Sequence, residues 1–149
     1  MRALVQRVSR AQVRVDDQVR GSIGPGLLVF LGISRQATLG QGNWLANKVA
    51  SLRIFPDEND RLNLSVKDTG GAVLVVSQFT LWADAQKGNR PSFSRAAGGE
   101  QALPLYSLFI DALKSNGLEV QEGEFGAIMQ VELVNNGPIT ICLEAPPSL

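Results

Sequence analysis

The sequence predicts a single α+β domain, in which two helices flank a mainly antiparallel sheet that curls toward a barrel. Three observations lead to this prediction. Stretches of period-two alternation recur along the chain, only two segments show helical spacing, and the connections between them are short. A length of 149 residues suits one domain, 1–149, and 44% hydrophobic with 19% charged residues is typical of a globular protein.

The first elements are predicted to be strands. Near-alternating apolar residues from Leu4 to Val15 indicate one strand, and Asp16-Asp17-Gln18 indicates a hairpin turn after it. Gly24-Pro25-Gly26 is predicted to form a second turn. The strand that follows, Leu27 to Gly32, is apolar on both faces, so we expect it to lie at the centre of the sheet.

Two segments are predicted to be helical. Leu45, Val49 and Leu52 recur at helical spacing and predict a helix over 38–52. A second helix is predicted to start near Leu103-Pro104 and to stop at Asn116-Gly117, because proline favours the start of a helix and glycine the position just past its end.

The remaining elements are strands and loops. Ala72 to Phe79 is predicted to be a buried strand, and Lys87 to Gly99 a polar loop. From Met129 to Val134 the alternation predicts a strand with one wetter face. Asn135-Asn136-Gly137-Pro138 is expected to break it, and Ile139 to Leu143 to form the last strand.

Composition restricts the chemistry. The chain has no histidine, which excludes His-based triads, Cys-His dyads and His-containing metal sites. Catalysis would have to use carboxylates, hydroxyls, Lys or Arg, backbone amides or the substrate itself. Cys142 is the only cysteine, so no intrachain disulfide can form. We expect no metal and no cofactor.

Charge and hydropathy restrict partners and location. The net charge is zero, so a nucleic-acid partner would have to be held locally rather than by a global basic field. The alternating, charged N-terminus does not resemble a signal peptide, and the longest apolar runs are too short to span a membrane. We therefore expect a cytoplasmic protein with no membrane partner.

The first candidate site is Ser77-Gln78-Phe79-Thr80-Leu81, at the end of a buried strand. Polar groups at such an end are well placed to face a pocket, although the two hydroxyls could simply satisfy nearby backbone groups. A nucleophilic Ser77 or Thr80 would need a base, and no histidine exists. Backbone N–H groups at the bend could instead stabilise an oxyanion.

The second candidate is Asn135 to Thr140. Asn-Gly between alternating runs is a strong hairpin signal, but Pro138 removes an N–H where the return strand would begin. Gly137 permits backbone angles closed to other residues, so the pair could present two carbonyls in an unusual orientation. Arg7, in the middle of a strand, is either a partner for a carbonyl or a sheet-edge residue.

The third candidate is the loop Lys87 to Arg95. It carries three positive charges, on Lys87, Arg90 and Arg95, with an aromatic residue and no acid. Such a loop could contact phosphates or could simply be solvated.

Taken in this order and separation, Ser77-Gln78-Phe79-Thr80 and Asn136-Gly137-Pro138-Ile139-Thr140 resemble the two signature motifs of the D-aminoacyl-tRNA deacylase family. The likeness extends over nearly the whole chain. It includes Gln6-Arg7-Val8, Gly24 to Leu28, Arg53-Ile54-Phe55, Gly71 to Leu81, Arg90 to Ser94 and Met129-Gln130-Val131. The second motif departs slightly, with Asn136 where many members carry Asp and Ile139 where Val is frequent.

The resemblance implies a homodimeric hydrolase with active sites at the subunit interface. Its substrate would be D-aminoacyl-tRNA, and glycyl-tRNA mischarged on tRNA(Ala) to some extent, so that it serves chiral proofreading in translation quality control. A cis Gly137-Pro138 pair from one subunit would exclude L-amino acids from the site of the other. The ribose 2′-OH of the tRNA would help to activate water.

The resemblance also assigns roles to residues. Ser77, Gln78, Phe79 and Thr80 would form the catalytic segment, with the amides of Phe79 and Thr80 as oxyanion donors. Arg7, Asn136 and Thr140 would support the Gly-Pro pair, and Phe125 and Met129 would form the pocket for the terminal adenosine. Contacts to tRNA phosphates are expected from the charge pattern of the basic loop, at Lys87, Arg90 and Arg95. Without the resemblance, Phe125 and Met129 could equally be core residues.

Two rival hypotheses come from other classes of protein. A non-catalytic module would bind tRNA or a nucleotide through the same pocket without turnover. A small-molecule esterase would use Ser77 or Thr80 as nucleophile, with Lys or a carboxylate as base, and would lose activity on replacement of that hydroxyl.

Overall fold

A computed structural model describes residues 1–149, which form two α-helices, one 3-10 turn and eight strands. The helices are α1 (Leu39–Ser51) and α2 (Gly99–Ser115), and the 3-10 turn is η1 (Phe79–Trp82). The strands are β1 (Arg2–Val15), β2 (Gln18–Ile23), β3 (Gly26–Gly32), β4 (Phe55–Pro56), β5 (Leu62–Leu64), β6 (Ala72–Ser77), β7 (Glu119–Glu122) and β8 (Gln130–Glu144).

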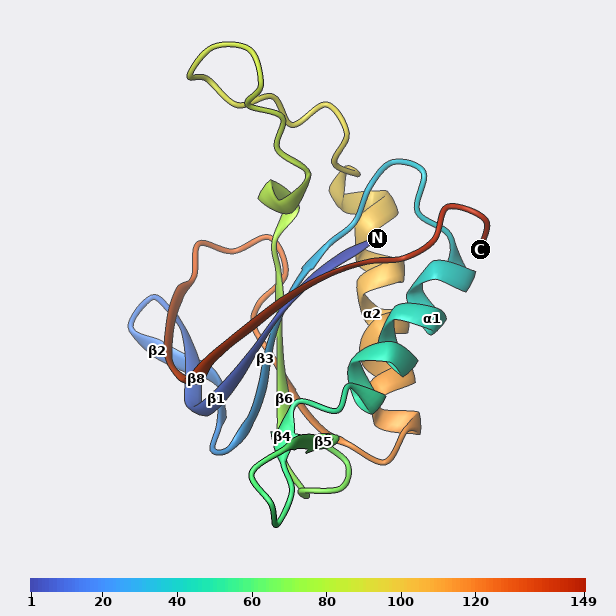
Figure 1. The fold of residues 1–149 in the computed structure, drawn as a ribbon. Helices are drawn as coiled ribbons and strands as arrows, with labels where there is room; N and C mark the ends of the chain where they lie inside the picture. Colours follow the sequence, from blue (N-terminus) through green and yellow to red (C-terminus); the bar gives the residue numbers. More distant parts are fainter.

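Strand β1 organises the six-stranded main sheet, whose order is β2-β1-β3-β6-β7 with β8 on β1. One edge of β1 pairs with β3 and then β2, and the other pairs with β8 over almost its whole length. These three pairings are antiparallel, whereas β3–β6 and β6–β7 are parallel. The short strands β4 and β5 form a separate hairpin at the lower end in Figure 1.

The sheet curls until its ends approach each other. Strand β2 contacts β6 and β7, although it pairs with neither. Gly21 of β2 lies so close to β7 that a Cβ atom there would be 2.7 Å from the carbonyl oxygen of Glu122. A glycine is therefore required for this approach. The predicted α+β fold with a barrel-like sheet and two flanking helices is confirmed.

Hydrophobic residues fill both faces of the sheet. Helices α1 and α2 lie side by side over one face (Figure 1) and bury a large cluster that includes Val29, Val75 and Phe109. Inside the curl, a smaller cluster includes Val13, Leu28 and Leu74. Leu28 and Val29 point to opposite faces and are both fully buried, which confirms that β3 is a central strand.

The predicted turn after β1, the start of α1 and the glycine after α2 are confirmed. Asp16 and Asp17 have φ of 48° and 61°, as the tight turn between β1 and β2 requires. Thr38 caps α1, accepting a hydrogen bond from the amide of Gln41 at 3.1 Å. Gly117, with φ of 82°, follows the end of α2.

Two predicted boundaries are wrong. Helix α2 begins at Gly99 rather than near Leu103-Pro104, so Pro104 lies inside it. The amide that Pro104 lacks would have paired with the carbonyl of Glu100, in the exposed first turn, where water can replace it. Strand β6 ends at Ser77, before Phe79, because the chain turns into η1.

The sequence predicted a break or a hairpin tip at Asn135-Asn136-Gly137-Pro138, and this prediction is wrong. Strand β8 runs continuously through it, and both halves pair with β1 in the same direction. Gln6 pairs with Thr140 and Val8 with Asn135, so four residues of β8 stand opposite Arg7 alone. The segment is therefore a large bulge.

Candidate active site

The candidate catalytic segment lies where three parallel strands end. Because β3, β6 and β7 are parallel, the residues after them meet at one edge of the sheet. Ser34 and Arg35 follow β3, Gln78 and Phe79 follow β6, and Gly123 follows β7. Ligands of sheets with parallel strands commonly bind outside these carboxyl ends. The sequence did not predict this parallel arrangement.

The turn after β6 has a fixed backbone. The amide of Gln78 donates to the carbonyl of Leu31 at 2.8 Å, and the carbonyl of Gln78 accepts from the amide of Leu81 at 3.2 Å. Phe79 and Thr80 are the first two residues of η1, so their amides have no acceptor within the turn. Both residues are exposed. The turn therefore holds two neighbouring N–H donors at a solvent-facing position.

The hydroxyls of this segment have no strong base as partner. The Nε2 of Gln78 donates to Thr80 Oγ1 in a short hydrogen bond. Neither Thr80 nor Ser77 forms a hydrogen bond with a Lys, Asp or Glu side chain. A serine or threonine nucleophile needs such a partner for activation. The arrangement favours backbone stabilisation of an oxyanion over a hydroxyl nucleophile.

Phe125 comes from the loop after β7, at the same edge of the sheet. Its ring packs at 5.3 Å from the ring of Tyr106, and the Tyr106 hydroxyl donates to the carbonyl of Val75 at 3.1 Å. Burial, and less strongly the negative charge of Glu122, raise the pKa of Tyr106 well above its ordinary value. Tyr106 therefore fixes the position of Phe125. Tyr106 was not among the predicted site residues, although it is the only tyrosine and lies beside the apolar face of α2.

Met129 lies further along the same loop. It packs against the smaller cluster inside the sheet, and a Cβ on Gly123 would lie 2.7 Å from its sulfur. Phe125 packs against the other cluster, below the helices. Both side chains are half-buried. Each side chain therefore packs against a hydrophobic cluster and also leaves part of its surface exposed to solvent on the loop after β7.

The bulge in β8 is held by side chains on both sides. Arg7 donates from Nε to the carbonyl of Asn136 and from Nη1 to that of Ile54, each at 2.8 Å. The side chain of Asn135 bridges the bulge, accepting from the amide of Ile139 at 2.9 Å and donating to Thr140 Oγ1 at 2.8 Å. Asn136 contributes its carbonyl, since its side chain forms no hydrogen bond.

Gly137 and Pro138 form the outer part of the bulge. The peptide bond between them is cis, and Gly137 has φ of 145°. A Cβ at Gly137 would lie 2.7 Å from Cγ1 and 2.8 Å from the amide nitrogen of Ile139. Only glycine fits this conformation. The sequence pointed to Arg7, Gly137 and Thr140, but it gave no role to Asn135, whose place directly before the motif was the available signal.

A single chain does not bring the two motifs together. The bulge lies opposite Arg7 of β1, Arg7 pairs with Leu27 of β3, and Leu27 pairs with Val73 of β6. The bulge is therefore at the level of Val73, four residues before Ser77, and is separated from β6 by three strand-to-strand steps. At about 3.3 Å per residue and about 4.8 Å per strand, this is roughly 19 Å along the sheet.

The basic loop is connected to η1 through aromatic rings. Phe93 packs edge-on against Phe79, with ring centroids 5.1 Å apart. The guanidinium of Arg95 lies 5.0 Å from the centre of the Trp82 ring. Asp84 bridges Ser92, so Lys87 and Arg90 lie in the connection between these two residues, and both are exposed. The loop projects beyond the sheet (Figure 1). The structure therefore brings Arg95 to the turn and leaves Lys87 and Arg90 further out.

No group of three or more Cys, Asp or Glu side chains is arranged to hold a metal ion. Neither helix is long and apolar enough to cross a membrane. Cys142 is a free, exposed thiol on β8.

Comparison with known proteins identifies the family. Residues 4–144 match the family model described as D-Tyr-tRNA(Tyr) deacylase. The D-aminoacyl-tRNA deacylase of Anaeromyxobacter dehalogenans is 57% identical over 145 residues, covering 97% of this chain and 97% of that protein. The protein of the same name from Symbiobacterium thermophilum is 52% identical over 145 residues, covering 97% of this chain and 96% of its own.

Two solved structures share the fold. A protein named c-Myc DNA Unwinding Element Binding Protein has a TM-score of 0.91 at 42% identity, covering 98% of this chain and 99% of its own. A probable eukaryotic D-amino acid tRNA deacylase has a TM-score of 0.80 at 17% identity, covering 95% of this chain and 97% of its own, and supports the fold alone. The match over nearly the whole chain shows that this protein belongs to the D-Tyr-tRNA(Tyr) deacylase family.

Proposed function

We propose that the protein hydrolyses the ester bond between a D-amino acid and the 3′ end of tRNA, releasing the free amino acid and tRNA. Family membership supplies the reaction class. The observation that carries the proposal is the pair of amides at Phe79 and Thr80, which lack acceptors within η1 and lie at the carboxyl ends of the parallel strands. They suit a reaction that creates an oxyanion in a chain without histidine.

The proposed chemistry requires little from side chains. An aminoacyl ester is already activated, so positioning and oxyanion stabilisation supply most of the effect. Water attacks the ester carbonyl, the amides of Phe79 and Thr80 stabilise the negative charge that forms on its oxygen, and the ribose 2′-OH of the substrate assists proton transfer. Ser77 and Gln78 position the segment, and Phe125 and Met129 contact the terminal adenosine.

Chiral selection is assigned to the bulge in β8. In this proposal, Gly137 and Pro138 present backbone carbonyls to the amino group of the substrate, and an L side chain would collide with them. A D side chain points away, and glycine has no side chain to exclude, so glycyl-tRNA mischarged on tRNA(Ala) is also cleaved. The hydrogen bonds from Arg7 to Asn136 and from Asn135 to Thr140 support such a role, because they fix the bulge.

We also infer that the active form is a homodimer, in which the bulge of one subunit completes the site of the other. The separation of roughly 19 Å between the two motifs along the sheet supports this. So does β8, whose second edge has no partner strand in the single chain. Ile128, just before β8, is 93% exposed, and a second copy would cover it.

The expected partner is aminoacyl-tRNA in the cytoplasm. Lys87, Arg90 and Arg95 are the proposed contacts to its phosphates, and their positive charges carry no acidic neighbours in ion pairs. Such a local contact is consistent with a chain of zero net charge.

Turnover of D-Tyr-tRNA, measured beside tRNA binding, tests the proposal against its rivals. We expect multiple-turnover release of tyrosine, and only a mild loss of activity in Ser77→Ala. Binding without release would identify a non-catalytic module. Complete loss of activity in Ser77→Ala, together with hydrolysis of simple esters lacking tRNA, would identify a serine esterase.

A further inference from the structure

A cavity of about 390 Å³ lies beside η1. Trp82 contributes to its wall, as do Arg35, at the end of β3, and Arg95, at the end of the basic loop. Its position next to the candidate catalytic turn follows from Trp82, which is the last residue of η1. The cavity is within the usual size range of ligand sites.

The two arginines are held in place by their backbones. The amide of Arg35 donates to the carbonyl of Arg95 at 3.0 Å, and Ser34 forms an isolated bridge with Ala96. The Nε of Arg35 donates to the carbonyl of Ala96 at 3.3 Å. The end of β3 and the end of the basic loop therefore form one unit that carries both guanidinium groups.

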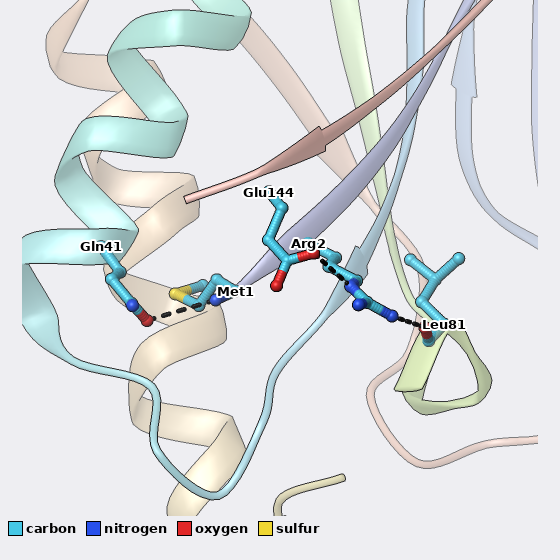
Figure 2. A network of polar contacts seen from close by, with 5 residues as sticks. All are labelled: Met1, Arg2, Gln41, Leu81 and Glu144. Carbon is cyan, nitrogen blue, oxygen red and sulfur yellow. Dashed lines mark hydrogen bonds and ion pairs between the residues drawn. The ribbon is translucent and has the colours of Figure 1, made fainter. Parts of the chain in front are cut away.

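The charge of this unit is not neutralised within the chain. Glu144 is the one carboxylate that lines the cavity, and Arg2 already pairs with it at 2.9 Å. Figure 2 shows Arg2 reaching from Glu144 to the carbonyl of Leu81, which accepts at 3.0 Å. Neither Arg35 nor Arg95 forms an ion pair. Two positive charges thus face a cavity without a free counterion.

The N-terminal amine of Met1, which also lines the cavity, is held within the chain. It donates to Oε1 of Gln41 at 3.2 Å (Figure 2). Burial lowers the pKa of the amine, Glu144 raises it to a lesser degree, and Arg2 lowers it. The amine is engaged by Gln41, whereas the guanidinium groups of Arg35 and Arg95 have no acidic partner.

Trp82 provides a second, independent indication of a ligand. Its side chain is 4% exposed, and its buried Nε1–H has no acceptor in the chain. Guanidinium groups lie over its ring, from Arg2 at 4.0 Å and from Arg95 at 5.0 Å. A buried donor without a partner is costly. An acceptor supplied by a ligand would complete its hydrogen bonding.

We propose that Arg35 and Arg95 bind a phosphodiester of the tRNA 3′ strand in this cavity, just upstream of the terminal adenosine. The assignment rests on the proposed function and adds Arg35 to it. Arginine forks bind phosphate oxygens in bidentate geometry. The cavity adjoins the turn at which the ester would react, so the contact would fix the terminal nucleotide over Phe79 and Thr80.

The test compares D-tyrosyl esters of adenosine, which lacks the phosphodiester, and of the dinucleotide CpA, which contains it. The variants are Arg35→Gln and Arg95→Gln. The matched control is Arg61→Gln, an exposed arginine near β5 whose side chain forms no hydrogen bond. We expect each cavity variant to lower kcat/KM for the CpA ester, through KM, about tenfold more than for the adenosine ester.

Salt dependence gives a second readout. The slope of log(kcat/KM) against log[salt] for D-Tyr-tRNA should decrease in magnitude by about 0.7 for each lost contact to a single strand. Arg61→Gln should match the wild type in both measurements. Equal losses on the two esters, or no loss on either, would overturn the proposal while leaving deacylation intact.

A direct measurement of CpA binding tests the phosphodiester site independently of the proposed hydrolytic function. If the wild-type protein hydrolyses neither of these esters nor D-Tyr-tRNA, the proposed function fails, and the affinity for CpA is then measured from tryptophan fluorescence. Binding of CpA that is weakened about tenfold in Arg35→Gln would still support the phosphodiester site. Equal affinity of wild type and variant for CpA, or competition by inorganic phosphate as strong as by CpA, would refute it.

Discussion

Replacing Arg7 with alanine should remove the side-chain hydrogen bonds that hold the bulge in β8. Arg7 holds the carbonyls of Asn136 and Ile54 with two hydrogen bonds of 2.8 Å. A hydrogen bond from a charged donor contributes about 1.5–3 kcal/mol. Since Arg7 is half-exposed and water can replace part of each bond, we expect Arg7→Ala to lower the free energy of unfolding by about 2–3 kcal/mol.

The same change should affect hydrolysis. If about 2 kcal/mol of this loss falls on the active arrangement of Gly137 and Pro138, kcat/KM for D-Tyr-tRNA should decrease roughly 30-fold, at about 1.4 kcal/mol per factor of ten. Urea unfolding measures the first quantity, and single-turnover deacylation measures the second.

Two matched variants check the reasoning. Arg7→Lys can satisfy one carbonyl but not both, so it should recover about half of the stability loss. Asn136→Ala keeps the backbone carbonyl that Arg7 binds, and should stay within about 0.5 kcal/mol and threefold of the wild type. Wild-type activity in Arg7→Ala, or an equal loss in Asn136→Ala, would refute the role assigned to Arg7.

Three further predictions follow from single residues. Gly137→Ala should destabilise the protein by about 1–3 kcal/mol and weaken D/L discrimination, because its Cβ would lie 2.7 Å from Ile139. The control Gly24→Ala, whose Cβ would have no atom within 4 Å, should have no effect. Equal behaviour of the two variants would contradict the bulge geometry. Phe79→Pro should be about 100–1000 times slower in kcat than Phe79→Ala, since only proline removes the proposed oxyanion donor. Gln78, with φ of −145° and ψ of 81°, lies outside the α region that a following proline disfavours, and equal rates of the two variants would exclude that donor. Burial raises the pKa of Tyr106, so the folded state disfavours the phenolate. The contribution of Tyr106 to the free energy of unfolding is therefore complete below the ordinary pKa of 10.0 and is lost as pH rises above it, with a slope that approaches about 1.4 kcal/mol per pH unit. Tyr106→Phe should abolish this slope. Because the chain has one tyrosine, phenolate absorbance reports this group directly, and half-ionisation near pH 10 in the folded protein would contradict the burial argument.

Much of the fold was predictable because local signals agree with tertiary packing. Leu28 and Val29 are both buried, as a fully apolar strand requires, and Thr38 caps α1 where the helical spacing begins. The start of α2 was missed because Gly98 and Gly99 resemble a loop, while packing of residues such as Ala102 against the core stabilises the helix earlier.

The bulge and the edge of parallel strands were harder to predict. Strand β8 continues through Gly137 and Pro138 because β1 supplies pairing partners on both sides of the interruption, at Gln6 and Val8. Local turn signals contain no information about such a partner. The direction of β6 relative to β3 is likewise set by a connection through α1, so the meeting of Arg35 with Phe79 at one edge required the topology.

The rates of tyrosine release from D-Tyr-tRNA and from L-Tyr-tRNA test the central claim most directly, with spontaneous hydrolysis of each ester as the reference. Our account predicts rapid, multiple-turnover release from the D ester and release from the L ester close to the spontaneous rate. Equal acceleration of both esters would contradict the selection assigned to Gly137 and Pro138. Acceleration of neither, under conditions in which the tRNA binds, would contradict the hydrolytic function itself.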